Sequence, residues 1–180
     1  MMLKDKTIIV TGGASGLGRA TCVLAAKEGA NVTIADMDAA GAAETRRMID
    51  AEGRRSIVVT MDTAKAADAK RMAEETVAAF GTIDGIVCGA IRLKPGKLEE
   101  LTEENWDAVV DVGLKGYFLC AQAAGRVMLA KGKGSIVFIS SVGGVQAYNG
   151  AGAYSIAKAG AIMLGHLVGV EWGGRGVRGK

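Results

Sequence analysis

Short runs of β-branched and other apolar residues alternate along this chain with longer, alanine-rich stretches that carry charges. The five runs span residues 7–12, 31–36, 56–62, 83–89 and 134–141. The longer stretches predict helices over residues 17–29, 39–52, 65–80, 102–131 and 152–173. Runs that are apolar on both faces and separated by helices indicate a parallel sheet covered on both sides. The alternation therefore predicts an α/β fold, a doubly wound parallel sheet in three layers.

The length and composition limit the class of protein. A chain of 180 residues, 49% of them hydrophobic, suits one domain, 1–180, with a sizeable core. The net charge of +3 comes from basic residues mixed with acidic ones, which argues against a nucleic-acid partner. Cys22, Cys88 and Cys120 lie far apart and form no C-x-x-C pair. We expect buried thiols in a reducing compartment, with no disulfide and no metal site.

The apolar segments of the sequence do not predict export or membrane insertion. The first residues, MMLKDKTIIVTGG, lack the long apolar segment of a secretion signal. The tract AGAIMLGHLVGVEW is interrupted by His166, and we expect it to be too short for a membrane span. We interpret His166 as a packing or subunit-contact residue. The expected protein is cytoplasmic and has no membrane partner.

A glycine-rich turn, TGGASGLG over residues 11–18, follows the first predicted strand and opens the first helix. Glycines in such a turn let the backbone approach a pyrophosphate, whose charge meets the amides of the helix N-terminus. Asp36, at the end of the second strand, can accept hydrogen bonds from a ribose diol. Together these features predict a dinucleotide site. The alternative is a tight turn that holds no ligand.

The aspartate also bears on which dinucleotide is bound. A carboxylate at Asp36 repels a 2′-phosphate, and neither Ser15 nor Met37 supplies a compensating positive charge, so NAD is favoured over NADP. Arg19, just past the turn, stays open as a phosphate partner. Asp62, which ends the third predicted strand, is a candidate contact of the adenine. Its alternative role is an N-cap of the following helix.

A tyrosine and a lysine four residues apart begin the last predicted helix, in the segment YSIAK. Tyr154 and Lys158 therefore share one helix face. A phenol has an unperturbed pKa of about 10, and a neighbouring ammonium group lowers that pKa. A tyrosine tuned in this way can pass a proton while hydride moves. Ser141, at the end of the fifth strand, can hold the substrate oxygen. Alone, a tyrosine and a lysine four residues apart are also common on helix surfaces, and a serine that ends a strand is an ordinary turn residue.

In combination, TGGASGLG, Asp36, Asp62, Ser141 and YSIAK resemble the short-chain dehydrogenase/reductase family, in order and spacing, over nearly the whole chain. The resemblance implies a Rossmann-type fold and nicotinamide-dependent interconversion of alcohols and ketones. It also implies a homodimer or homotetramer that associates through long helices. By position, Tyr154 is the acid/base, Lys158 lowers its pKa and binds the nicotinamide ribose, and Ser141 orients the substrate. The residues expected to bind the cofactor are Gly12, Ser15, Gly16, Leu17, Gly18, Asp36, Asp62, Thr63, Gly89, Tyr154 and Lys158.

The sequence departs from that family in three places. Relatives usually have Asn-Asn-Ala-Gly where this chain has Cys88 to Ile91, and asparagine where it has Gly113. Glycine keeps a backbone carbonyl and permits a bend, but it lacks the side-chain amide. Relatives also continue beyond GGRGVRGK with further strands, so we expect the strand at 134–141 to be an exposed edge. The alternatives to a catalyst are a non-catalytic dinucleotide-binding or oligomerisation module, or an incomplete fragment of a longer dehydrogenase.

Overall fold

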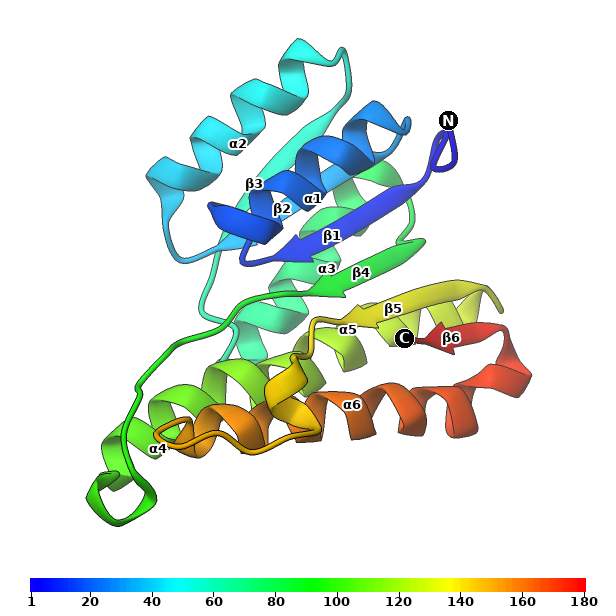
Figure 1. The fold of residues 1–180 in the computed structure, drawn as a ribbon. Helices are drawn as coiled ribbons and strands as arrows, with labels where there is room; N and C mark the ends of the chain where they lie inside the picture. Colours follow the sequence, from blue (N-terminus) through cyan, green and yellow to red (C-terminus); the bar gives the residue numbers. More distant parts are fainter.

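All the strands of the chain lie in one parallel sheet. The computed structural model describes residues 1–180, and its strand order is β3-β2-β1-β4-β5-β6. The strands are β1 Thr7–Thr11, β2 Asn31–Asp36, β3 Ser56–Thr60, β4 Gly85–Cys88, β5 Gly134–Phe138 and β6 Val177–Gly179. The arrows in Figure 1 all point the same way, so the carboxyl ends of the strands share one edge of the sheet. The order reverses between β1 and β4, where sheets of this kind bind ligands.

Helices cover both faces of the sheet. Their bounds are α1 Gly16–Lys27, α2 Ala39–Ala51, α3 Ala66–Phe80, α4 Glu103–Val110, α5 Gly116–Ala130 and α6 Gly152–Trp172. The pair α1 and α2 packs on one face, and α3, α5 and α6 pack on the other (Figure 1). The predicted doubly wound sheet in three layers is confirmed.

Strand β1 shows why apolar runs of this kind need cover on both faces. Successive side chains of a strand point to opposite faces. Accordingly, Ile8 and Val10 pack with the helices α1 and α2, while Ile9 between them packs in the cluster of α3 and α5. Ile9 and Val10 are completely buried. Burying a side chain of this size stabilises the fold by about 1.5–3 kcal/mol, so the two apolar faces hold the sheet between its helix layers.

The strand β5 is not an exposed edge, and that expectation was wrong. The chain returns after α6 and adds β6, which pairs in parallel with β5 through the partners Gly134 and Val177. Gly176 makes the return possible: its φ is +82°, and a methyl group there would overlap the carbonyl oxygen of Gly132. Val177 is completely buried. The sheet edge on this side is therefore a strand of three residues, and short edges limit unwanted pairing.

The helix predicted over 102–131 is interrupted in its middle. Between α4 and α5, residues Asp111–Lys115 form a turn of π-helix around the buried Gly113. Such turns are rare and occur often at functional sites. A methyl group at Gly113 would overlap Cδ1 of Ile91, which follows β4. Ile91 and Gly113, which both differ from the family pattern, are therefore in contact: the side chain of Ile91 occupies the space that a larger residue at position 113 would need.

Helix α6 and its extension, Gly152–Arg175, are long and apolar enough to cross a membrane by length and composition alone. This differs from the expectation that the tract is too short, because His166 does not lower the mean hydropathy enough. In the fold, however, α6 lies against β5 and β6 and buries Ala161 and Val168 in the core beneath the sheet. A helix that covers a sheet can have the same length and composition, so these two properties are weak evidence for a membrane span.

Candidate active site

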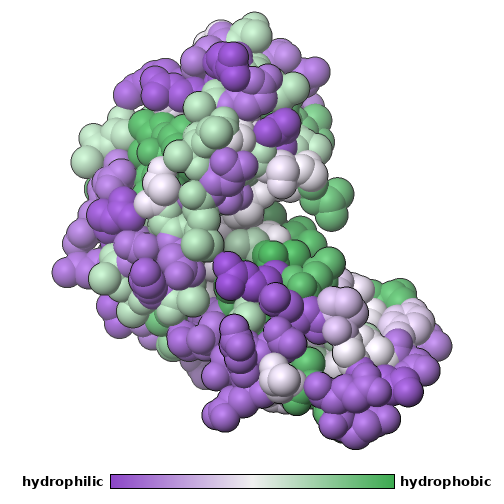
Figure 2. Space-filling model, turned by 90° about the vertical axis from the view of Figure 1, so that its left-hand side faces the viewer, coloured by the Kyte–Doolittle hydropathy of each residue, from purple (hydrophilic) through white to green (hydrophobic).

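A cavity of about 470 Å³ lies at the carboxyl ends of the strands, on both sides of the point where the strand order reverses. Figure 2 faces this edge of the sheet and shows a hollow in which hydrophobic residues gather between more hydrophilic parts of the surface. Ten of the residues predicted from the sequence line the cavity: Gly12, Ser15, Gly16, Leu17, Gly18, Asp36, Thr63, Gly89, Tyr154 and Lys158. The fold therefore brings the candidate dinucleotide turn and the candidate catalytic pair to one cavity.

Asp62 does not line the cavity, although its neighbours Met61 and Thr63 do. Its carboxylate Oδ1 accepts a hydrogen bond of 3.0 Å from the main-chain N–H of Ala64, and its own N–H donates to Asp68. Helix α3 begins later, at Ala66, so Asp62 is not the N-cap either. The side chain holds the turn that leads from β3 into α3.

Ser141 lies beside the cavity rather than in its lining. Its Oγ accepts a hydrogen bond of 3.1 Å from the main-chain N–H of Gly143. A methyl group added at Gly143 would lie 3.5 Å from this Oγ and 3.4 Å from Cε1 of Tyr154. The serine hydroxyl and the tyrosine ring therefore border the same small space next to Gly143.

The glycine-rich turn has the tight packing that a phosphate-binding turn needs. Gly12 has a φ of +75°, and its N–H donates to the carbonyl of Ala35 at 2.9 Å. A methyl group at Gly18 would overlap the carbonyl oxygen of Gly12, so the start of α1 presses directly on the turn. At Gly16 there is no heavy atom within 4 Å of such a methyl group, so its backbone faces open space. The turn thus presents helix N-terminal amides to the cavity, an arrangement that fits a pyrophosphate.

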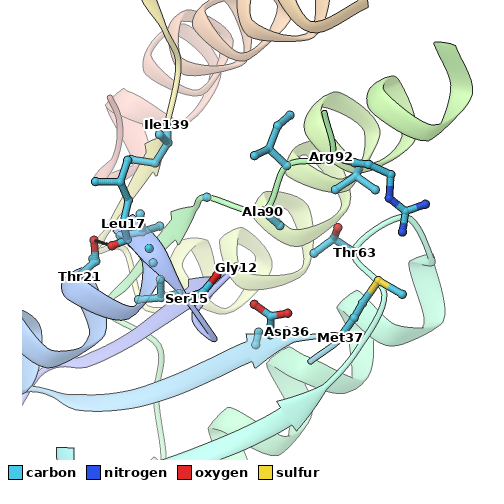
Figure 3. A pocket seen from close by; sticks show the side chains of 18 of the residues that line it. Gly12, Ser15, Leu17, Thr21, Asp36, Met37, Thr63, Ala90, Arg92 and Ile139 are labelled. Atoms are coloured by element: carbon cyan, nitrogen blue, oxygen red, sulfur yellow. Dashed lines mark hydrogen bonds between the residues drawn. The ribbon is translucent and has the colours of Figure 1, made fainter. Parts of the chain in front are cut away.

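Asp36 is held in place by two backbone groups. Its Oδ2 accepts from the N–H of Ala14 and its Oδ1 accepts from the N–H of Asp38, each at 3.0 Å. Figure 3 shows the carboxylate between Gly12 and Met37. An ionised carboxylate has about four acceptor positions, so two hydrogen bonds leave capacity for a ribose diol. The residues present therefore fit the adenosine half of a nicotinamide dinucleotide.

Arg19 is engaged within the protein. Its guanidinium donates to the main-chain carbonyls of Ala14 and Gly41 and to Oγ1 of Thr45. These contacts tie the glycine-rich turn to α2, and the guanidinium does not line the cavity. Arg19, the possible phosphate partner named from the sequence, therefore donates its hydrogen bonds to oxygens of the protein itself.

Lys158 is only 2% exposed, and burial lowers its pKa from 10.5 to about 8. Its ammonium nitrogen lies 5.7 Å from the centre of the Tyr154 ring. Its main-chain carbonyl accepts a hydrogen bond of 2.8 Å from Oγ of Ser140, which lies two residues beyond the end of β5. This hydrogen bond ties helix α6 at Lys158 to the segment that follows β5.

The lowered pKa of Lys158 predicts a pH dependence of stability. The unfolded chain binds the proton more tightly than the folded one between pH 8 and pH 10.5, so folding stability rises with pH across that window. Over this range we expect the free energy of unfolding to rise by about 2–3 kcal/mol more in the unmodified protein than in Lys158→Met. Urea unfolding of both proteins at several pH values measures this difference. Parallel pH profiles would show that Lys158 titrates normally.

Some residues that line the cavity were not predicted from the sequence. They include residues that follow β4 and β5 and residues close to the glycine-rich turn and Asp36: Ile91, Arg92, Val112, Ile139, Ser140, Thr21 and Met37. In Figure 3 the side chain of Arg92 extends toward the side where Thr63 and Met37 lie. The residues around Arg92 in the sequence give no signal that its side chain lines the cavity. Its position depends on the path of the loop that follows β4. No group of three or more histidine, cysteine, aspartate or glutamate side chains could hold a metal ion.

The sequence is similar to a known family and to individual proteins over nearly its whole length. The sequence model of the family described as short chain dehydrogenase matches residues 6–179. D-threitol dehydrogenase of Mycolicibacterium smegmatis is 36% identical over 178 residues, covering 98% of this chain and 68% of that protein. Cis-4-hydroxycyclohexanecarboxylate dehydrogenase of Sinomonas cyclohexanicum is 35% identical over 175 residues, covering 97% of this chain and 70% of that protein.

The fold has close counterparts among solved structures. The structure of carveol dehydrogenase from Mycobacterium avium in complex with NAD superposes with a TM-score of 0.96 at 29% identity. The match covers 99% of this chain and 69% of that one. A short chain dehydrogenase from Mycobacterium paratuberculosis bound to NAD superposes with a TM-score of 0.95 at 26% identity, covering 99% of this chain and 71% of that one.

Proposed function

Because the chain belongs to the short-chain dehydrogenase family, we propose that it is an NAD(H)-dependent oxidoreductase that interconverts a secondary alcohol and a ketone. The observation that carries the proposal is the shared cavity: Asp36 and the glycine-rich turn line one part of it, and Tyr154 and Lys158 line another. Hydride transfer requires a dinucleotide site next to a group that moves the proton, here Tyr154 beside the buried Lys158.

Each residue then has a separate task. NAD, when bound, supplies the hydride acceptor. In the oxidation direction the Tyr154 phenolate takes the proton of the substrate alcohol as the alcohol loses its hydride, and in the reverse direction the Tyr154 phenol gives that proton to the carbonyl oxygen. The ammonium of Lys158 faces the Tyr154 ring at 5.7 Å, and its positive charge stabilises the phenolate oxygen. Ser141 donates a hydrogen bond to the substrate oxygen from the space it borders with Tyr154.

The positions of Asp36 and Arg19 support NAD rather than NADP as the cofactor. The carboxylate of Asp36 lines the cavity, where it would repel a 2′-phosphate. Arg19, the cation nearest to the turn in sequence, is held by backbone carbonyls of Ala14 and Gly41. The proteins from Mycobacterium avium and Mycobacterium paratuberculosis were solved with NAD, which agrees with this choice.

Removal of the carboxylate should change the choice of cofactor. In Asp36→Ala, we expect the affinity for NAD to fall about ten- to a hundredfold, because hydrogen bonds to a charged group are lost. The affinity for NADP should rise, since the repulsion is gone. Isothermal titration of both dinucleotides measures the two changes, with Asp50→Ala, an exposed carboxylate of α2, as the control. Equal losses for NAD and NADP would contradict the assignment.

We also propose that the protein is cytoplasmic and assembles as a homodimer or homotetramer. Helix α6 supports an assembly, because Ile156, Met163, Leu167 and Val170 are large apolar side chains, 45–83% exposed, at helical spacing. Exposed apolar groups of this kind mark protein contacts. Sedimentation equilibrium should therefore give a mass two or four times the 18.4 kDa of one chain, and a monomer at micromolar concentration would contradict the proposal.

The general test of function is spectroscopic. Purified protein is mixed with NAD and a panel of secondary alcohols, and the absorbance of reduced nicotinamide is followed. We expect turnover on at least one alcohol and little with NADP. If NAD binds in calorimetry but no alcohol is oxidised and no ketone is reduced, the chain is a non-catalytic dinucleotide-binding module.

A further inference from the structure

Tyr117, in the first turn of α5, has not been given a task by the family pattern or by the proposed function. The residue is 1% exposed and lies just after the π-helical turn Asp111–Lys115. Its hydroxyl donates to the carbonyl of Ile139 at 3.2 Å, and it accepts a hydrogen bond of 3.1 Å from Nζ of Lys158. A buried phenol therefore connects α5, the end of β5 and the ammonium of α6.

The Tyr117 hydroxyl is one of only two hydrogen-bond acceptors of the Lys158 ammonium. An ammonium has three donors, and in Lys158 two of them are taken by the Tyr117 hydroxyl and the Ile139 carbonyl. Burial is the only cause of its lowered pKa, so no carboxylate helps to hold the charge. The ammonium also lies 5.1 Å from the centre of the Tyr117 ring, within the range of a cation–π contact. One donor remains for the cavity.

Tyr117 is suited to be a fixed and neutral partner. Burial, together with Cys88 and Tyr154, raises its pKa, so the phenol keeps its proton and can donate to Ile139 while accepting from Lys158. Its ring packs against Phe138 with 6.2 Å between the ring centres. Because both its ring and its hydroxyl are held, the Tyr117 side chain has one orientation. Its hydrogen bond to Lys158 therefore fixes where the ammonium lies.

We propose that Tyr117 is a positioning residue that holds the Lys158 ammonium against Tyr154 and aims its remaining donor into the cavity. The proposal deepens the function proposed above and rests on it where the ligand is NAD. The hydroxyl itself does not touch the reacting atoms. It acts through Lys158, and the phenol ring shields the charge from water.

The first test needs no catalysis. The pKa of Lys158 is measured by NMR on lysine labelled with ¹³C at Cε, and its signal is assigned by its loss in Lys158→Met. In Tyr117→Phe, which keeps the ring, we expect this pKa to fall by about one unit below its present value near 8, because an acceptor of the charged form is lost. An unchanged pKa would overturn the proposal.

The matched control removes another buried hydroxyl. Thr33, on β2, is completely buried, and its Oγ1 lies 2.9 Å from that of Thr76, away from the cavity. Thr33→Val therefore loses a buried hydrogen bond without touching the site. It should leave the pKa of Lys158 unchanged. An equal fall in both variants would mean that general loosening of the core, not the Tyr117 hydroxyl, is responsible, and would also overturn the proposal.

The second test is a double-mutant cycle on NAD affinity, measured by calorimetry. If Tyr117 acts through Lys158, Tyr117→Phe should weaken NAD binding about tenfold in the unmodified protein and less than twofold in Lys158→Met. Equal weakening in both backgrounds would contradict the proposal. If the unmodified protein binds no NAD at all, the proposed function fails, whereas the NMR result still decides whether Tyr117 positions Lys158.

Discussion

Replacement of Tyr154 by phenylalanine is expected to lower kcat about 10²–10⁴-fold, because a positioned acid/base contributes that much to proton transfer. The ring stays in place beside Lys158, so NAD affinity should change less than threefold. Steady-state kinetics on the best alcohol of the panel measure the first effect, and calorimetry with NAD measures the second. Loss of turnover with intact binding separates a chemical role from a structural one.

The control for this variant is Ser155→Ala. Ser155 is the next residue in α6, and its buried Oγ has no hydrogen-bond partner in the structure. Its removal should leave kcat within twofold of the unmodified protein. If Tyr154→Phe retains more than a tenth of the original kcat, another group moves the proton and the assignment of Tyr154 is wrong.

Substitution of Gly18 by alanine is expected to have the second-largest effect. The added methyl group would overlap the carbonyl oxygen of Gly12, which is backbone and cannot move without opening the glycine-rich turn. We expect a loss of about 3 kcal/mol in the free energy of unfolding, the upper range for overpacking. NAD binding should fall below detection by calorimetry, since the turn and the first amides of α1 no longer face the cavity together.

Gly169→Ala is the matched control for this second variant. Gly169 also lies in a helix, α6, but no heavy atom is within 4 Å of an added methyl group. Alanine there should raise the free energy of unfolding by up to about 1 kcal/mol through its better helix propensity, and NAD affinity should not change. If Gly18→Ala binds NAD as tightly as Gly169→Ala does, the turn is not the pyrophosphate site.

Most of the fold could be predicted because its signals are local. The strands β1 and β2 are apolar on both faces, and the structure places their ends within one residue of the prediction. Strands β3, β4 and β5 are shorter than predicted, since β3 ends at Thr60 and β5 at Phe138. The residues cut from their carboxyl ends, such as Ile139 and Ser140, turn out of the sheet and line the cavity instead.

The features that escaped prediction depend on contacts between distant residues. Strand β6 has three residues, too few for a periodic pattern, and it exists because the turn at Gly176 lays Val177 beside β5. The hydrogen bond between Tyr117 and Lys158 joins residues 41 positions apart. In the sequence, Tyr117 is one apolar position of a helix, and only the packing of α5 against α6 turns it into a partner of the site.

The proposed function is hydride transfer between an alcohol and NAD. The most direct measurement uses an alcohol that carries deuterium on its hydroxyl-bearing carbon, incubated with the protein and NAD, followed by mass spectrometry of the reduced nicotinamide. We expect the deuterium to appear in the reduced cofactor, and the rate of this transfer to be lower in Tyr154→Phe by the same factor as kcat. Unlabelled cofactor after incubation with an alcohol that the protein converts, or no conversion of any alcohol while NAD binding is intact, would contradict it.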